Sequence, residues 1–172
     1  MTNGSWVALL RGINLGKRQL KMEDLRAVAA RIGLDRPRTY IASGNVLFGS
    51  GDSEAALKQA LEAALTDHMG ARVGVMIRTA LEIAEVAAQN PFASEPGNTV
   101  VAFFLDHPPP PRALDEMKNV ADEQVALGTR EIYVHYPAGI GQSKLAIPAT
   151  AKGTARNMNT VAKLAELAKE PQ

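Results

Sequence analysis

The sequence contains no cysteine. The chain therefore has no disulfide bond, no thiolate nucleophile and no zinc site built from thiolates. Its three histidines, His68, His107 and His135, are scattered, and no two of them are four residues apart. Because a metal site needs several ligands at one place, we expect neither a metal ion nor another cofactor.

Long apolar runs are also absent. The longest are far shorter than the roughly 20 residues needed to span a bilayer, and no basic segment precedes the first one, so no signal peptide is visible. Of the 172 residues, 46% are apolar and 22% are charged, which is usual for globular proteins and argues against disorder. We therefore expect a soluble, cytoplasmic protein without membrane contact, containing one sizeable core or two small ones.

Acidic residues are missing from two stretches of the chain. The net charge is only +1, which by itself favours no class of partner. Residues 1–22 and residues 132–165 nevertheless carry four basic residues each and no acid, so they total +8 against −7 for the remainder. This asymmetry indicates an anion-facing surface if the two stretches meet in space, whereas the alternative is that the basic residues only solvate two loops.

Hydrophobic periodicity in the first 78 residues predicts the element order β-α-β-β-α-β. The predicted elements are strands at 5–10, 38–42, 46–48 and 72–78, a helix beginning near Met22, and a helix that has Asp52 and Ser53 as N-cap candidates and ends near Gly70. This order is that of the ferredoxin-like split βαβ arrangement, whose antiparallel strands lie in the order 4-1-3-2. The loop after the first strand and the turn after the second should then emerge at the same end of the sheet.

The second half gives a similar order of elements. The capping box Thr79-Ala80-Leu81-Glu82 opens a helix that stops at Asn90-Pro91, and residues 90–98 form the best internal boundary. We therefore expect two domains, 1–90 and 91–172. The later predicted elements are a strand at 99–105, a helix striped by Leu114, Met117 and Val120, a hairpin of 124–127 and 131–136, a short strand at 145–147, and a last helix from Asn157 or Asn159. The predicted fold is thus α+β, with two tandem ferredoxin-like subdomains and antiparallel sheets. The second subdomain is expected to be incomplete or rearranged, with its last strand missing or displaced.

A glycine loop, Arg11-Gly12-Ile13-Asn14-Leu15-Gly16-Lys17, follows the first buried strand. Two glycines let the backbone approach a ligand closely, and Arg11, Asn14 and Lys17 offer hydrogen-bond donors. The loop is not a phosphate-binding P-loop, because three residues separate its glycines and Arg18 follows the lysine. It favours a looser anion cradle, whereas the alternative is a sharp turn capped by Asn14.

Two further polar segments are candidates. Ser43-Gly44-Asn45 is an ordinary hairpin turn, but its expected position beside Arg11 makes Ser43 and Asn45 candidate ligand residues. Residues 150–160 precede the last helix, whose N-terminus favours anions, and they contain more donors than one helix cap needs. The candidate ligand-binding residues of the second half are Lys144, Arg156, Asn157, Asn159 and Thr160.

Four of these segments together resemble the bacterial domain-of-unknown-function family 1697. They are Arg11–Asn14, Tyr40–Val46, Ile140–Leu145 and Thr154–Thr160, and the resemblance runs from about residue 5 to residue 168. One departure is Met158, where the family commonly has tryptophan, which weakens any argument for an aromatic stacking surface there. The resemblance implies an α+β fold of two ferredoxin-like parts in a soluble protein, and it implies no activity.

The sequence therefore favours binding of a phosphorylated small molecule or nucleotide in a basic cleft between the halves, with or without a reaction. No side chain is a better candidate nucleophile than Ser43, so no reaction is named. RNA or single-stranded DNA binding across the sheet is the alternative, although aromatic residues are only 5% of the chain. A structural or regulatory protein-interaction module is a further alternative.

Overall fold

The computed structural model describes residues 4–16 and 18–169. They form an α+β fold with two four-stranded antiparallel sheets and four α-helices. One compact unit comprises the described residues up to Ile83 together with those from Leu164 onward, and the other comprises Ala84–Lys163. The predicted boundary near residue 90 stays a prediction. Within the described part of the chain, no helix has the length and apolar character needed to cross a membrane.

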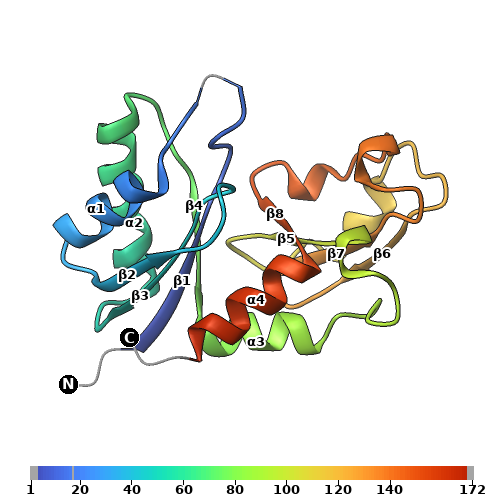
Figure 1. Cartoon of the computed structure of the whole chain (residues 1–172). Coiled ribbons are helices and arrows are strands. Elements are labelled where there is room, and N and C mark those ends of the chain that lie inside the picture. The colour runs from blue at the N-terminus through green and yellow to red at the C-terminus, as the bar shows by residue number, and fades with distance from the viewer. Residues whose placement is uncertain (1–3, 17, 170–172) are drawn as a thin grey trace. The chain divides into compact units, whose positions relative to one another are not determined.

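The first sheet has the strand order β2-β3-β1-β4, as the sequence predicts. Its strands are β1 (Gly4–Leu10), β2 (Asp35–Thr39), β3 (Asn45–Ser50) and β4 (Val75–Thr79), and every neighbouring pair is antiparallel (Figure 1). In the central strand β1, Leu9 pairs with Asn45 of β3, and Leu10 pairs with Val75 of β4. The end of β1 therefore lies between the start of β3 and the start of β4.

The edge strand β2 is irregular. Its register with β3 shifts between Asp35 and Arg38, and Arg36 within the shift has a φ of +46°. Pro37 follows and has no backbone N–H to donate. The Arg38 side chain donates from Nη2 to the Leu167 carbonyl at 2.9 Å, which ties β2 to the last helix.

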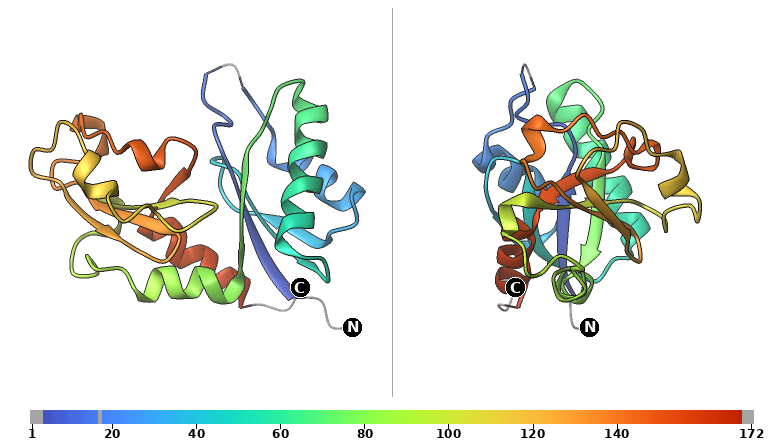
Figure 2. Two further views of the ribbon diagram at one scale, coloured as in Figure 1. Left: turned by 180° about the vertical axis from the view of Figure 1, so that it is seen from behind. Right: turned by 90° about the vertical axis from the view of Figure 1, so that its right-hand side faces the viewer.

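Two helices, α1 (Met22–Arg31) and α2 (Glu54–Met69), cover one face of this sheet, as both views show (Figure 1; Figure 2). Their buried side chains meet Ala8, Leu10, Val46 and Phe48 of the sheet in one apolar cluster. Of the two N-cap candidates of α2, Asp52 and Ser53, the structure has Ser53 as the cap, because its Oγ accepts a hydrogen bond from the Ala56 N–H at 3.2 Å. The helix ends as predicted, at Gly70 in the left-handed conformation.

The second sheet has the order β6-β7-β5-β8, so by position in the chain it repeats the order of the first sheet. Its strands are β5 (Val100–Phe104), β6 (Gln124–Leu127), β7 (Glu131–His135) and β8 (Thr154–Asn157). The predicted hairpin of β6 and β7 is confirmed. Of the two alternatives predicted for the last strand, missing or displaced, the first is wrong, because β5 pairs with a further strand, β8. Its four residues are mostly polar, and the pairing that makes them a strand joins distant parts of the chain.

Two other predictions for this half are wrong. The stripe of Leu114, Met117 and Val120 forms no α-helix: a 3-10 turn ends at Glu116, Met117 is extended, and Val120 is 50% exposed. The predicted strand at 145–147 is reduced to one bridge, in which Lys118 and Ala146 exchange backbone hydrogen bonds of 2.9 Å. The 3-10 turns in the described part of the chain are Gly97–Thr99, Ala113–Glu116, Ile140–Gln142 and Pro148–Thr150.

The remaining helices each follow a strand without a loop. Thr79 at the end of β4 caps α3 (Ala80–Ala88) in the predicted capping box with Glu82, through hydrogen bonds of 2.9 and 3.1 Å. Asn157 at the end of β8 caps α4 (Met158–Ala168), because its Oδ1 accepts from the Thr160 N–H at 3.0 Å. The same strand–cap–helix junction therefore closes each sheet.

A buried arginine precedes each of these caps. Arg78 is 1% exposed and Arg156 is 6% exposed. In both, Nη1 donates to the carbonyl of the preceding residue, at 3.0 Å to Ile77 and 2.9 Å to Ala155. The two halves thus share a local feature that the sequence does not make obvious.

The turn before β3 gives a prediction about stability. Gly44 has a φ of +91°, and a Cβ added there would lie 2.5 Å from Ile13 Cδ1 and 3.0 Å from Leu10 Cβ. We expect Gly44→Ala to lower the free energy of unfolding by roughly 2 to 5 kcal/mol, from backbone strain and overpacking together. Gly33→Ala is the matched control, because its φ is +90° but no atom lies within 4 Å of the added Cβ, and it should cost about 1 to 2 kcal/mol. Equal losses in urea unfolding of the two variants would contradict this account.

Candidate functional site

The β1–α1 loop is held by the side chain of Asn14, whose φ is +56°. Asn14 Nδ2 donates to the Leu20 carbonyl at 3.0 Å and to the Ala42 carbonyl at 2.6 Å, and Oδ1 accepts from the Leu20 N–H at 2.6 Å. The contact with Ala42 confirms that this loop and the turn after β2 lie side by side. Because both Nδ2 hydrogens are used within the protein, the geometry gives Asn14 a structural role.

The turn after β2 is closed by Asn45. This residue is fully buried, and its Nδ2 donates to the Tyr40 carbonyl at 2.8 Å and to Ser43 Oγ at 3.1 Å. The Leu10 N–H donates to the Gly44 carbonyl at 2.8 Å, which joins the turn to the end of β1. Asn45 is therefore out of reach of a ligand, whereas Ser43 is exposed on the turn.

Three arginines lie at this end of the first sheet. Arg11 is exposed, and its backbone N–H donates to the Gly74 carbonyl at 2.9 Å. Arg18 is half-buried, and its Nη2 donates to the carbonyl of Arg72, whose own side chain is exposed. Within the described residues, the buried Nε of Arg18 has no hydrogen-bond partner. Lys17, the remaining predicted residue of this loop, lies outside the described residues.

Two backbone donors of the loop are unpaired. Among the residues that the structure describes, the N–H groups of Gly12 and Ile13 make no hydrogen bond. Gly12 has a φ of +67°, and a Cβ added there would lie 3.6 Å from Arg18 Nη1. The Arg18 guanidinium therefore lies close to the backbone that carries these donors.

Arg156 lies within the second sheet and not in a loop. Its Nη1 donates to Thr154 Oγ1 and to the Ala155 carbonyl, both at 2.9 Å. Burial lowers the pKa of Arg156 to about 10, so the guanidinium remains charged at neutral pH. The sequence predicts no strand within residues 150–160, whereas the structure has β8 at Thr154–Asn157.

The other predicted residues near α4 have separate surroundings. Asn157 is the helix cap, and Thr160 is 8% exposed. Asn159 is exposed but packs against Gly97, where an added Cβ would lie 2.1 Å from its Oδ1. The sequence indicates that either Asn157 or Asn159 caps the last helix, and in the structure the cap is Asn157.

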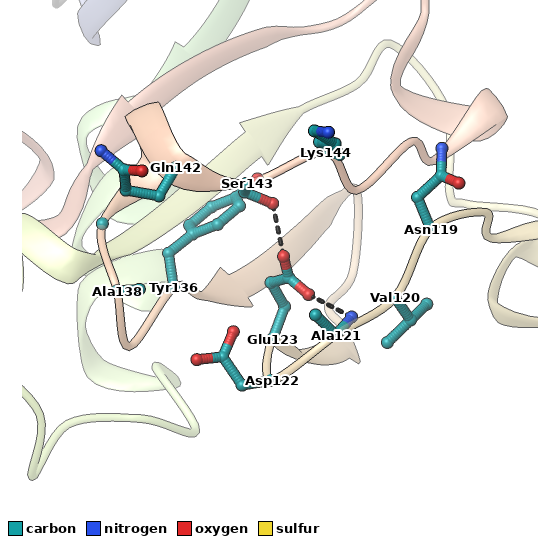
Figure 3. Close-up of a pocket in the computed structure, with 11 residues that line it drawn as sticks. Asn119, Val120, Ala121, Asp122, Glu123, Tyr136, Ala138, Gln142, Ser143 and Lys144 are labelled. Atoms are coloured by element: carbon teal, nitrogen blue, oxygen red, sulfur yellow. Dashed lines mark hydrogen bonds between the residues drawn. The ribbon is translucent and has the colours of Figure 1, made fainter.

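A pocket of about 270 Å³ lies in the second unit (Figure 3). One wall is residues 119–123, and the other contains Tyr136, Ala138–Gly139 and Gln142–Lys144. Among the sequence candidates that the structure describes, Lys144 alone lines this pocket. The two walls meet through the backbone bridge between Lys118 and Ala146.

Glu123 is the anchored side chain of this pocket. Its Oε2 accepts from Ser143 Oγ at 2.5 Å, and its Oε1 accepts from the Ala121 N–H at 2.7 Å (Figure 3). The hydrogen bond from Ser143, followed by those from the backbone N–H groups of Ala121 and Glu123, lowers the pKa of Glu123. Glu123 is therefore ionised at neutral pH.

Tyr136 lines the pocket next to this carboxylate. It is 5% exposed, and burial, with a further contribution from the charge of Glu123, raises the pKa of Tyr136 to about 12. Within the described residues its hydroxyl makes no hydrogen bond. The pocket thus combines an ionised carboxylate with a neutral phenol whose hydroxyl is not engaged.

Sequence reasoning missed Arg72, Glu123 and Tyr136. The segment Gln142-Ser143-Lys144 gave a partial signal, because it belongs to one of the four quoted motifs and forms a wall of the pocket. Glu123 gave none, because the segment before it was assigned to a helix. No group of three or more His, Cys, Asp or Glu side chains in the described part of the chain could hold a metal ion.

The Asn14 side chain gives a second prediction about stability. Asn14→Ala removes three hydrogen bonds, and we expect it to lower the free energy of unfolding by roughly 1.5 to 4 kcal/mol. Gln19→Ala is the control in the same loop, because Gln19 is exposed and its side chain makes one hydrogen bond to the described residues, from Nε2 to the Gly16 carbonyl at 2.8 Å. It should cost less than about 1 kcal/mol. Urea unfolding measures both, and equal losses would show that Asn14 does not hold the loop.

The Ser143–Glu123 hydrogen bond gives a prediction about pH. A carboxyl group whose pKa is lowered by folding stabilises the fold above its unfolded pKa of roughly 4.3, and this contribution is lost as pH falls through the folded pKa. Ser143→Ala removes the largest cause of the lowering. The variant should therefore be less stable than the wild type at neutral pH, and the difference should shrink at about pH 3.

Urea unfolding at both pH values tests this. Ser53→Ala is the control, since the described interaction of that hydroxyl is with the Ala56 N–H and with no carboxylate. The loss in free energy of unfolding caused by Ser53→Ala should change less with pH than the loss caused by Ser143→Ala. A Ser143→Ala deficit that is the same at both pH values would contradict the assignment.

Comparison with known proteins agrees with this fold. A solved structure titled as that of the conserved bacterial protein SP0830 from Streptococcus pneumoniae matches with a TM-score of 0.80 and 24% sequence identity. The match covers 98% of this chain and 99% of that one. No curated protein matches the chain. The model of the family described as "Protein of unknown function (DUF1697)" matches residues 3–133, which include the first two of the four motifs, and the chain belongs to this family.

Proposed function

We propose that the β1–α1 loop binds the phosphate of a phosphorylated small molecule or nucleotide. The observation that carries this proposal is the pair of N–H groups of Gly12 and Ile13, which have no hydrogen-bond partner in residues 4–16 and 18–169 and lie beside the Arg18 guanidinium. Adjacent backbone N–H groups and a guanidinium are donors of the kind that bind phosphate oxygens. The proposal concerns the first unit alone.

The charges around the loop support an anion. Arg11 and Arg72 add positive charge at the same end of the sheet, and residues 1–22 contain no acid. The buried Nε of Arg18 lacks a partner within the described residues, and under this proposal the anion accepts its hydrogen bond. Since an unpaired buried donor costs about 1 to 3 kcal/mol, a bound anion would also relieve a cost of the unliganded state.

We further propose that each unit is a version of the ferredoxin-like arrangement. The support is the shared strand order and the shared strand–cap–helix junction. In the second unit, 3-10 turns stand where the first has α1 and α2. Under this proposal the second unit is the rearranged member of the pair.

Stacking of nucleic-acid bases on aromatic side chains has less support. Trp6 is half-buried, packs against the core cluster and donates from Nε1 to the Ser50 carbonyl at 3.2 Å. Tyr133 and Tyr136 are buried. Binding of single-stranded nucleic acid is therefore the alternative function, and the experiment below distinguishes it from binding of a small phosphorylated ligand.

Isothermal titration of the full chain with pyrophosphate, ATP and a short single-stranded RNA tests the proposal. We expect pyrophosphate or ATP to bind, and Arg18→Gln and Arg11→Gln each to raise the Kd by roughly 10- to 100-fold, since hydrogen bonds to charged groups contribute about 1.5 to 3 kcal/mol. Arg31→Gln is the matched control, because Arg31 is exposed in the last turn of α1, and it should leave the Kd unchanged.

Salt dependence separates a pocket from a nucleic-acid surface. A contact with many phosphates loses about three to five decades of affinity between 50 and 200 mM salt. A loss of that size, with RNA as the preferred ligand, would replace the proposed function by nucleic-acid binding. Absence of binding by any of the three ligands, with folded variants, would refute the loop as an anion site.

A further inference from the structure

The pocket of the second unit is lined by side chains of opposite charge that make no hydrogen bond or ion pair within the described residues. Asp122 and Lys144 both line it, and within the described residues neither makes a hydrogen bond or an ion pair. The amides of Asn119 and Gln142 line it as well, and their side chains are also unpartnered there. Polar groups that face a pocket and are not used by the fold are available to a ligand.

The anchored carboxylate of Glu123 lies between these groups. Figure 3 shows it at the centre of the pocket residues, with Gln142 to one side and Asn119 to the other. The carboxylate accepts hydrogen bonds from Ser143, from the Ala121 N–H and from its own backbone N–H, and a carboxylate has about four acceptor positions. Glu123 is thus fixed in position and still has acceptor capacity.

Lys144, which carries the positive charge of the pocket, is close in sequence to a residue that binds the Glu123 carboxylate. Lys144 directly follows Ser143, whose Oγ is 2.5 Å from Glu123 Oε2. Its long side chain can place the ammonium group a short distance from Glu123 without pairing with it. A ligand can therefore meet a fixed negative group and a movable positive group within one small volume.

We propose that this pocket binds a small zwitterion of the α-amino acid type. Glu123 and the Tyr136 hydroxyl receive the ligand's ammonium group, and Lys144 with the Asn119 amide binds its carboxylate. This site is distinct in chemistry and location from the phosphate site proposed for the β1–α1 loop, and it does not depend on that proposal.

The charges argue for a zwitterion over an ion of one sign. Two carboxylates and one ammonium line the pocket, so a phosphate would meet Glu123 and Asp122 with one lysine to offset them. A dication would in turn be repelled by Lys144. A ligand with one charge of each sign satisfies both sides, and specificity arises from repulsion of the other classes.

The size and walls of the pocket limit the rest of the ligand. About 270 Å³ is at the lower end for small-molecule sites, so the ligand is of amino-acid size. Val120 is 50% exposed and, with Ala138, gives the wall a short apolar part. A short aliphatic side chain therefore suits the pocket best.

A thermal-shift screen of the full chain with each standard L-amino acid at about 10 mM, roughly ten times a millimolar Kd, is the first test. We expect a subset with short aliphatic side chains to raise the midpoint temperature. For L-alanine the matched probes are propionate, which lacks the ammonium group, and ethylamine, which lacks the carboxylate. Neither should match the shift given by the amino acid.

Variants then assign the two charges by titration calorimetry. Lys144→Met and Tyr136→Phe should each raise the Kd of the best amino acid by about tenfold or more, since each removes one hydrogen-bonding group. Lys152→Met is the control, because Lys152 is an exposed lysine of the same unit outside the pocket. Lys144 is exposed and unpartnered within the described residues, so its replacement should leave the fold intact.

Three results would overturn the proposal: no shift with any amino acid, an equal shift with propionate alone, or equal affinity of wild type and Lys144→Met. Binding of pyrophosphate that is lost in Arg18→Gln but kept in Lys144→Met would belong to the loop site. The two proposals can therefore fail separately.

Discussion

The conformation of the β1–α1 loop in the first unit depends on the hydrogen bonds of one side-chain amide, that of Asn14. Asn14 joins the β1–α1 loop to its own far end at Leu20 and to the turn after β2 at Ala42. Asparagine tolerates the left-handed backbone conformation that it adopts here, and its short side chain can satisfy donors and acceptors locally. The same hydrogen bonds hold the part of the loop where the N–H groups of Gly12 and Ile13 have no partner among the described residues. The hydrogen bonds of Asn14 thus determine both the shape of the loop and the position of its Gly12 and Ile13 N–H donors.

The sequence predicts the first sheet well because its signals are local. Short apolar runs mark the strands, Asp52 or Ser53 and Gly70 mark the ends of α2, and the order of elements then limits the topology. That topology places the β1–α1 loop next to the turn after β2. The roles of Asn14 and Asn45 do not follow, because an amide offers the same donors to a ligand as to a carbonyl group of its own chain.

The second half is less predictable because its structure depends on distant pairings. A 3.6-residue apolar spacing predicts a helix at 114–120, but the bridge between Lys118 and Ala146 holds part of this segment extended. The same bridge joins the two walls that bring Glu123 to Ser143. Strand β8 is likewise defined by its pairing with β5 and not by its own polar residues. Propensity is a weak guide where tertiary contacts decide the backbone.

The irregular edge strand β2 has a consequence for how copies of this protein meet. A regular edge strand offers a row of N–H and C=O groups that can recruit another strand and start aggregation. At β2 the row is broken, because Pro37 has no N–H and the register shifts between Asp35 and Arg38. Charged side chains at Asp35, Arg36 and Arg38 add a further barrier. This border of the sheet is thereby closed to strand addition, and the chain is protected there against self-assembly into extended β-structure.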